Sequence, residues 1–559
     1  MGYGQNLKLA PNYPPQYLQQ KTIKMNRFLA ILLLTTFFKA NAQRNVILII
    51  ADDLGSDYCG FQENHLDTAS MPNVRKLLAR GVRFRNAWSN PVCSPTRAGM
   101  LTGRYSFRTG VGDALDGSGV GALDTAEISI PKLLNKFNPN GIAKANIGKW
   151  HLQEAMPVSN LLNPNKMGYD YFEGGFLGQI PSYTNWTKIT NGVSSTVTTY
   201  ATTEQTNNAI SWIKAQQSKP FFLWLAYNAP HTPFHLPPAN LHNYTTLSGT
   251  TADITANPKS YYKAAIQAMD KEIGRLFDSL QVLQKWDNTD IIFIGDNGDP
   301  GQVAQNTGGA KSTIYQEGVS VPFIISGPSV VNSNRVSSAL VNTQDLFATI
   351  LELFGYMTWQ SQIPTNKPVD SKSILPILKN QATDVRPWAF TEVFSTPSVA
   401  TNGKTMRNKQ YKLLDFDNGT QKFYKIDTDS TEDTDLLLRP LNTDASTNYN
   451  YLCNEMTTLV GTGGFCTLTP TGDVDEKGLD VTIFPNPTND ILAIQAPTAE
   501  SFNRTVSLIS LNGKVLQTNI LYHGSSICYL DIRTVCAGVY LVKVSAGQSS
   551  KTMKVVVSN

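Results

Sequence analysis

The chain has 559 residues, of which 41% are hydrophobic and 16% charged, and its 47 basic and 43 acidic side chains leave a net charge of +4. This length predicts more than one folding unit. The near-equal numbers of basic and acidic residues argue against a nucleic-acid-binding protein, which would carry a basic stripe. Aromatic residues at 10% exclude a disordered chain, and six cysteines are too few for a disulfide-built scaffold.

The N-terminus carries the pattern of an export signal. An apolar run over 28–38 follows a basic segment at 24–27 and precedes an Ala-Asn-Ala triplet at 40–42. The run is too short to span a bilayer, and this order of segments is typical of a cleaved secretory signal. We therefore predict that 1–42 is an upstream extension plus signal peptide, with the true start at Met25, and that the protein is secreted or held at the cell surface.

Strand and helix patterns then alternate. Short apolar runs predict buried strands over 45–50, 142–147, 221–227 and 290–294. Helical spacing predicts helices over 71–80 (ending at Gly81 as a C-cap), 128–137, 203–216 and 261–283. This alternation predicts an α/β domain whose mostly parallel sheet is covered by helices on both faces, and we assign it to 43–379.

The pattern changes after residue 351. Runs over 404–417 and 422–427 predict antiparallel strands joined by a turn at 417–420, so we assign 380–440 to a small α+β subdomain. Residues 441–479 are rich in Asn, Thr and Gly without clear periodicity, which predicts a linker.

Short strands separated by turn signals occupy 480–559 and predict a separate β-sandwich. Two cysteine pairs lie close in sequence and could form disulfides, Cys453 with Cys466 and Cys528 with Cys536.

Polar residues follow two of the predicted strands. Asp52 and Asp53 come directly after the first, and Asp296 and Asn297 follow the last. Either pair alone could cap a helix or form a turn. Together they offer oxygen ligands at the carboxyl ends of parallel strands, where such sheets bind ligands, and this donor set suits Ca²⁺ or Mg²⁺. The spacing of the His and Cys residues does not suggest zinc.

The most specific motif lies in 90–104, within which Cys93-Ser94-Pro95-Thr96-Arg97 precedes Thr102-Gly103-Arg104. This stretch resembles the formylglycine-dependent, arylsulfatase-like sulfatases, in which the Cys-x-Pro-x-Arg segment is oxidised to formylglycine after translation. Further positions match the family pattern in order: Asp52-Asp53, Gly148-Lys149-Trp150-His151, Ala229-Pro230-His231, Asp296-Asn297-Gly298 and Lys311. The resemblance spans about 45–325 and is weaker to about 440. It implies an alkaline-phosphatase-like core.

The resemblance also implies a metal and a nucleophile. One Ca²⁺ per chain would be held by Asp52, Asp53, Asp296 and Asn297 together with formylglycine at position 93. The hydrated aldehyde would attack sulfur, and the ion would hold sulfate oxygens and lower the pKa of the attacking hydroxyl. Asp296 would be the base that helps to deprotonate it.

Five further residues receive roles from the same resemblance. Arg97, Lys149 and Lys311 would neutralise charge that spreads over the transferred group. His231, aided by Lys311, would protonate the leaving alcohol. His151 would take a proton from the second hydroxyl, so that sulfate leaves and the aldehyde is regenerated.

The C-terminal sandwich has a resemblance of its own. Its segments 483–489 and 538–544 are similar to the type IX secretion sorting domain, and the alternative is a carbohydrate-binding β-module. The expected partners are therefore the type IX secretion machinery, a formylglycine-generating maturation enzyme and a sulfated carbohydrate substrate, with no nucleic acid.

The sequence thus predicts a calcium-dependent sulfatase for sulfated polysaccharides or oligosaccharides, algal ones among them. Two alternatives stay open: a formylglycine-dependent phosphodiesterase or phosphonate monoester hydrolase, and a non-catalytic carbohydrate-binding protein. His235, four residues beyond His231, is expected to be structural or to line the substrate site.

Overall fold

The computed structural model describes residues 1–4, 44–62, 65, 67–115, 121–305, 309–395, 398–461, 481–496, 504–511, 514–522, 525–546 and 549–558. They divide into two compact units. One holds the residues up to Leu437 and the segment that begins at Leu441, and the other holds Leu438–Pro440 and the C-terminal strands. The expected signal peptide and start site lie outside the described residues.

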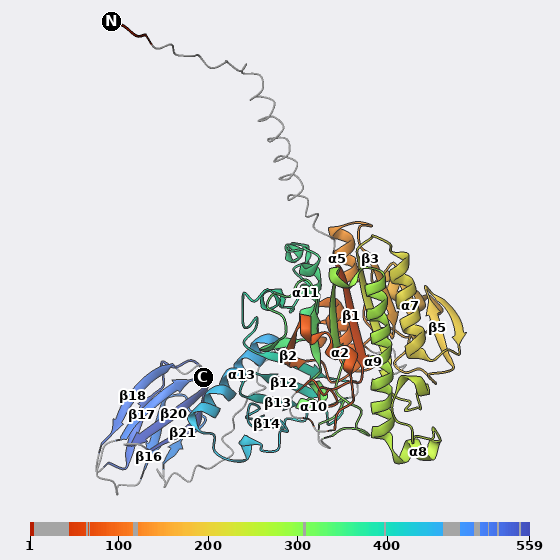
Figure 1. The fold of residues 1–559 in the computed structure, drawn as a ribbon. Coiled ribbons are helices and arrows are strands. Elements are labelled where there is room, and N and C mark those ends of the chain that lie inside the picture. Colours follow the sequence, from red (N-terminus) through yellow and green to blue (C-terminus); the bar gives the residue numbers. More distant parts are fainter. Residues whose placement is uncertain are drawn as a thin grey trace. The chain divides into compact units, whose positions relative to one another are not determined.

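The larger unit is built on a ten-stranded sheet with the order β10-β2-β9-β8-β1-β7-β3-β4-β5-β6 (Figure 1). Its strands are β1 (Asn45–Asp52), β2 (Gly81–Trp88), β3 (Ala143–Gly148), β4 (Tyr171–Gly174), β5 (Trp186–Thr190), β6 (Val193–Val197), β7 (Phe221–Pro230), β8 (Thr289–Gly295), β9 (Phe323–Ser326) and β10 (Arg335–Asn342). Strands β8, β1, β7, β3 and β4 run parallel, whereas β9 is antiparallel to both of its neighbours. This architecture confirms the predicted mostly parallel α/β class.

The apolar run of β1 is explained by its place in the sheet. All eight residues of the strand are buried. Val46, Leu48 and Ile50 join one hydrophobic core, and Ile47 and Ile49 join the core on the opposite face. A strand covered on both faces needs apolar side chains at every position, which is why it shows no alternation.

Helices supply the other half of each core (Figure 1). One face packs against residues of α3 (Cys93–Thr102), α5 (Ile130–Phe137) and α11 (Asp345–Leu353), and the other against α2 (Pro72–Arg75), α7 (Ala201–Ala215) and α9 (Pro258–Val282). The remaining helices of this unit are α4 (Ser106–Thr109), α6 (Asn163–Lys166), α8 (Thr251–Ala256), α10 (Gln316–Val319), α12 (Leu375–Leu378) and α13 (Thr443–Val460).

The helix predicted over 71–80 is wrong for most of its length. The segment forms the single turn α2 and a short 3-10 turn, Leu78–Arg80, and β2 begins at the residue expected as a C-cap, Gly81. A Cβ on Gly81 would lie 2.6 Å from the Leu77 carbonyl oxygen and 2.8 Å from that of Ile325. The glycine therefore permits the close approach of neighbouring backbone and does not end a helix.

The small antiparallel sheet lies in the same unit. Its strands are β11 (Ala389–Val393), β12 (Gly403–Arg407), β13 (Lys412–Phe416) and β14 (Gln421–Tyr424), paired in chain order. The single strand expected over 404–417 is a hairpin of β12 and β13.

Helix α13 corrects the prediction of a linker from residue 441. The Asn442 side chain caps the helix by accepting from the Ala445 N–H at 2.9 Å, and Gly461, with φ of 76°, ends it. Buried α13 side chains, Tyr449 and Leu452 among them, pack with residues of the small sheet. Cys453 on this helix is disulfide-bonded, and Cys466, its predicted partner, lies outside the described residues.

The second unit contains two antiparallel sheets that share one hydrophobic core. One sheet has the order β15 (Thr482–Phe484), β16 (Ile491–Gln495), β19 (Ile527–Asp531), and the other has β18 (Val515–Leu521), β17 (Arg504–Ser510), β20 (Gly538–Ala546), β21 (Ser549–Val557). The predicted Cys528–Cys536 disulfide is wrong, because both thiols are free: Cys528 is buried in the core and Cys536 is exposed. Across the described residues of both units, we find no helix with the length and apolar character needed to cross a membrane.

Candidate active site

The carboxyl ends of the parallel strands bring the predicted polar residues together. Strand β1 pairs with β7 on one side and with β8 on the other, and Asp52 lies opposite Pro230. The chain beyond these strands carries Asp53, His231 and Asp296, and the Asp53 N–H donates to Asp296 Oδ1 at 2.9 Å. Strand β3 adds Lys149 to the same edge.

Cys93 is the first residue of α3, a helix whose ten residues are all buried. Its Sγ lies 3.1 Å from Nδ1 of His151. The His151 Nε2 lies 3.0 Å from the Leu115 carbonyl oxygen, to which it donates, so Nδ1 is free to accept a proton. Burial and the Lys149 cation lower the pKa of His151, and the imidazole is therefore neutral. The Ser94 hydroxyl fixes this segment by donating to the His151 carbonyl at 2.9 Å.

Two fully buried cations pair with two fully buried carboxylates behind the cavity. Lys149 Nζ lies 2.8 Å from each oxygen of Asp52. Arg97 donates to Asp296 Oδ2 from two nitrogens, at 2.7 and 3.0 Å, and lies 3.4 Å from Asp52 Oδ1. Burial raises the pKa of Asp52 even against these cations. For Asp296, Arg97 and Lys149 outweigh burial and lower the pKa.

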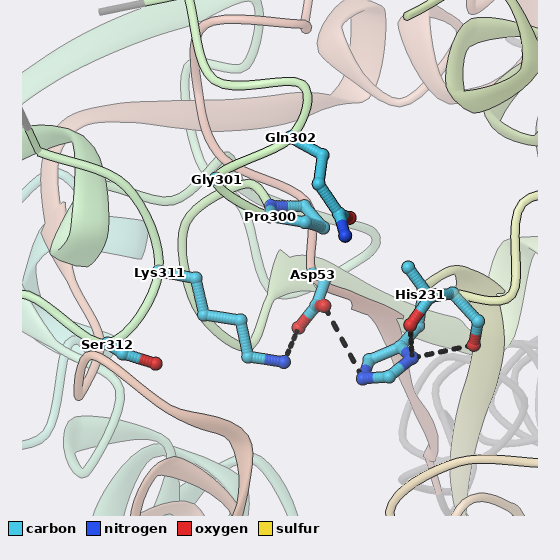
Figure 2. Close-up of a pocket in the computed structure, with 8 residues that line it drawn as sticks. Asp53, His231, Pro300, Gly301, Gln302, Lys311 and Ser312 are labelled. Atoms are coloured by element: carbon cyan, nitrogen blue, oxygen red, sulfur yellow. Dashed lines mark hydrogen bonds and ion pairs between the residues drawn. The ribbon is translucent and has the colours of Figure 1, made fainter. Parts of the chain in front are cut away.

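Asp53 faces the cavity between the side chains of Lys311 and His231 (Figure 2). Lys311 Nζ contacts its Oδ1 at 2.5 Å, and His231 Nε2 lies 3.4 Å from its Oδ2. Burial alone would raise the pKa of Asp53, but His231, Lys311 and Lys149 hold it well below its usual range, so the carboxylate is ionised. Asp53 and His151 both have φ near +60° (61° and 55°), a costly conformation that is common at functional sites.

The donor set fits a hard divalent cation. Ligand atoms of Asp52, Asp53 and His231 all lie within 4.8 Å of one another. The Oδ1 of Asn297 is buried and, within the part of the chain that the structure describes, has no hydrogen-bond partner, although its Nδ2 donates to Asp53 Oδ1 at 2.8 Å. A buried amide oxygen without a partner is costly, and together with the carboxylates it suits Ca²⁺.

A cavity of about 550 Å³ lies next to Asp53 and His231 (Figure 2). Its lining residues are Asp53, His231, Thr232, Pro300, Gly301, Gln302, Lys311 and Ser312. Three of the predicted site residues, Asp53, His231 and Lys311, therefore line the cavity. Five others are buried and are each at most 1% exposed: Asp52, Cys93, Arg97, Lys149 and Asp296.

Several residues of the site were missed in the sequence. Ser94 lies inside the cysteine motif, and Gln302 and Ser312 lie in polar loops without a distinguishing pattern. Asp299 accepts from the Gly55 N–H at 2.8 Å, and the Tyr262 hydroxyl contacts both the Asp299 carboxyl group and the Asp53 carbonyl oxygen. The position of Asp299 two residues after Asn297 could have marked it as a residue of the site.

Comparison with known proteins agrees with this arrangement. The family model described as Sulfatase matches residues 44–356. The chain belongs to the sulfatase family. Sulfatases are sulfuric ester hydrolases, and a second sulfatase-related model, N-sulphoglucosamine sulphohydrolase, C-terminal, matches 310–456. The model described as Secretion system C-terminal sorting domain matches 482–558, which identifies the type IX sorting domain and marks the chain for export to the cell surface or the medium.

Individual sulfatases are similar over more than half of this chain. The human N-acetylgalactosamine-6-sulfatase is 29% identical over 60% of this chain, which spans 65% of that relative's length. The uncharacterized sulfatase YdeN of Escherichia coli is 26% identical over 62% of this chain and 68% of its own length. Among solved structures, Ps i-CgsB in complex with k-i-k-neocarrahexaose matches with a TM-score of 0.62 and 25% identity, over 75% of this chain and 93% of that one. These matches support the alkaline-phosphatase-like sulfatase fold.

Proposed function

We propose that this protein is a calcium-dependent sulfatase that hydrolyses sulfate esters of carbohydrates with a formylglycine made from Cys93. The observation that carries the proposal is the placement of Cys93. Its Sγ lies 3.1 Å from His151, beside a buried group of carboxylates and cations. Bound Ca²⁺, with formylglycine at position 93, would supply an activated hydroxyl nucleophile and hold sulfate oxygens.

The cations would stabilise the negative charge of the transferred group. Arg97 and Lys149 are fully buried. Lys311 reaches Asp53 from a loop on the side opposite to His231 (Figure 2). Fixed charges in a site that excludes water act more strongly than they would in solvent.

The two histidines are suited to opposite proton transfers. His231 Nδ1 lies 2.8 Å from the Thr232 carbonyl oxygen and donates to it, so Nε2, which is directed at Asp53, is the atom that would carry a proton to the leaving alcohol. His151 Nδ1 is an acceptor directed at position 93. Asp296, kept ionised by Arg97, is our proposed base and metal ligand.

The substrate class is inferred from the relatives and from export. One relative is named N-acetylgalactosamine-6-sulfatase, and the Ps i-CgsB structure is a complex with k-i-k-neocarrahexaose. A sorting domain on the chain suggests action outside the cell, where sulfated polysaccharides, algal ones among them, are found. The proposal requires a formylglycine-generating enzyme and the type IX secretion machinery as partners.

The test is sulfate release by protein matured in a host that makes formylglycine. Cys93→Ala should lower turnover on the order of 10⁴-fold or more, because a nucleophile cannot be replaced by binding alone. Cys59→Ala is the matched control, since Cys59 is also a buried free thiol of the same unit. Full sulfate release by Cys93→Ala would refute the proposal, and faster turnover of an aryl phosphonate than of an aryl sulfate would favour a phosphonate monoester hydrolase.

A further inference from the structure

A cluster of aromatic residues packs behind the loop that carries His231. Tyr183, on the chain between β4 and β5, and Tyr200, just before α7, are 2% and 6% exposed. Their rings lie against the imidazole of His235, which comes four residues after His231. Two loops far apart in the sequence therefore meet beside the cavity.

The Tyr183 hydroxyl contacts the turn that presents His231. This turn is closed by the His231 N–H, which donates to the Asn228 carbonyl at 3.0 Å. The Tyr183 hydroxyl is directed at the Asn228 carbonyl oxygen at 2.5 Å and at the His231 carbonyl oxygen at 2.8 Å. The same turn is held from α7, because Gln205 Nε2 donates to Asn228 Oδ1 at 2.6 Å. The backbone of His231 is thus fixed on two sides.

His235 in turn holds the ring of Tyr183. The two rings are stacked, with centroids 3.8 Å apart and an angle of 22° between their planes. His235 Nδ1 donates to the Pro233 carbonyl oxygen at 2.9 Å, and the Tyr200 hydroxyl donates to His235 Nε2 at 3.0 Å. Both ring nitrogens are therefore occupied within the protein, which leaves His235 without a free atom for substrate.

We propose that Tyr183 is a positioning residue for His231: its hydroxyl holds the Asn228–His231 turn so that the His231 imidazole faces the leaving oxygen of the substrate, and stacking on His235 holds Tyr183. The inference rests on the proposed function, in which His231 protonates that oxygen. A small rotation of the turn would move Nε2 away from the cavity, and proton transfer depends steeply on such geometry.

The experiment measures how rate depends on the leaving group. Turnover of a series of aryl sulfates, from 4-nitrophenyl sulfate to phenyl sulfate (a leaving group with a pKa of about 10, as for tyrosine), is measured for the matured full chain. Poor leaving groups need the proton most. Loss of the proton donor therefore makes turnover depend more steeply on the pKa of the leaving group. The variants are Tyr183→Phe, His231→Ala and Tyr227→Phe. The last is a matched control, because Tyr227 is a buried tyrosine whose hydroxyl contacts Thr206 at 2.8 Å and not the His231 turn.

We expect Tyr183→Phe to slow phenyl sulfate at least about tenfold more than 4-nitrophenyl sulfate. This is less than the roughly 10²–10⁴-fold that general acid catalysis contributes, because the donor is displaced and not removed. His231→Ala should show the same selectivity more strongly, and Tyr227→Phe should show none. If Tyr183→Phe slows both substrates equally while His231→Ala remains selective, the positioning role is wrong and the proposed function stands. If His231→Ala is itself unselective, the role of His231 fails and the inference fails with it. Absence of turnover in the matured wild type would overturn the proposed function.

Discussion

Removal of the Lys149 ammonium should destabilise the larger unit strongly. Lys149 Nζ lies 2.8 Å from both oxygens of Asp52, and both side chains are fully buried. In Lys149→Met the Asp52 carboxylate keeps one cationic neighbour among the described residues, Arg97 at 3.4 Å. Breaking a buried pair by removing one partner costs about 3–5 kcal/mol, because the remaining carboxyl group must either stay charged without compensation or take up a proton.

Lys144, on the strand β3 that precedes Lys149, provides the control. Lys144 is also buried, but its partner Asp170, 2.9 Å away, has a side chain that is 49% exposed and can be hydrated when the lysine is lost. We therefore expect Lys144→Met to cost only about 1 kcal/mol. Adding Asp52→Asn to Lys149→Met should recover part of the lost stability, since no buried charge then remains unpaired.

Urea unfolding followed by tryptophan fluorescence measures this effect in the full chain. All eight tryptophans lie between Trp88 and Trp388, so the signal reports the larger unit and not the sorting domain. The unfolding free energies of the two variants are compared in the presence of a chelator, because a bound cation would itself balance the negative charge of Asp52. A Lys149→Met loss no greater than that of Lys144→Met would refute the reasoning.

Three further results are expected. Chelation of Ca²⁺ should lower the melting temperature of the larger unit, by the equivalent of about 2.7 kcal/mol if the ion had been present at 100 times its Kd, and an unchanged melting temperature would contradict a calcium site. Burial raises the pKa of Glu392 to about 7, against an ordinary 4.5, although the Phe107 N–H donates to it. The folded state therefore keeps a proton that the unfolded state loses, and stability should fall on the order of 3 kcal/mol as pH rises through that window. Glu392→Gln should flatten this part of the urea midpoint profile, and an unaltered profile would show that another group is responsible. Iodoacetamide should label Cys536 in the native protein but reach Cys59 and Cys528 only after unfolding, as peptide mapping would show, and native labelling of Cys528 would contradict its burial in the core.

The sheet and one part of the site could be predicted because central parallel strands have a simple signature. Strands β1, β3, β7 and β8 are buried on both faces and show as apolar runs, and the oxygen ligands lie at or just beyond the ends of β1 and β8. Helix α3 shows no amphipathic period, because it is buried on every side. No helix was predicted there, and only its first residues were recognised, through their resemblance to the sulfatase motif.

Other elements were missed for different reasons. In α13 the buried residues Tyr449, Leu452, Cys453 and Met456 recur at helical spacing, so the signal was present among many polar residues. By contrast, the contact of Tyr183 with the His231 turn depends on how two loops meet, and no local pattern in either loop reports it. Lys311 was placed by its order in the family pattern alone.

The most direct test is the mass of the peptide that contains residue 93. It is measured on protein purified from the native host, in fractions that differ in sulfatase activity. Active molecules should carry an aldehyde at this position, and the inactive fraction should retain the Cys93 thiol. Fully active protein with an unmodified thiol at residue 93 would contradict this expectation.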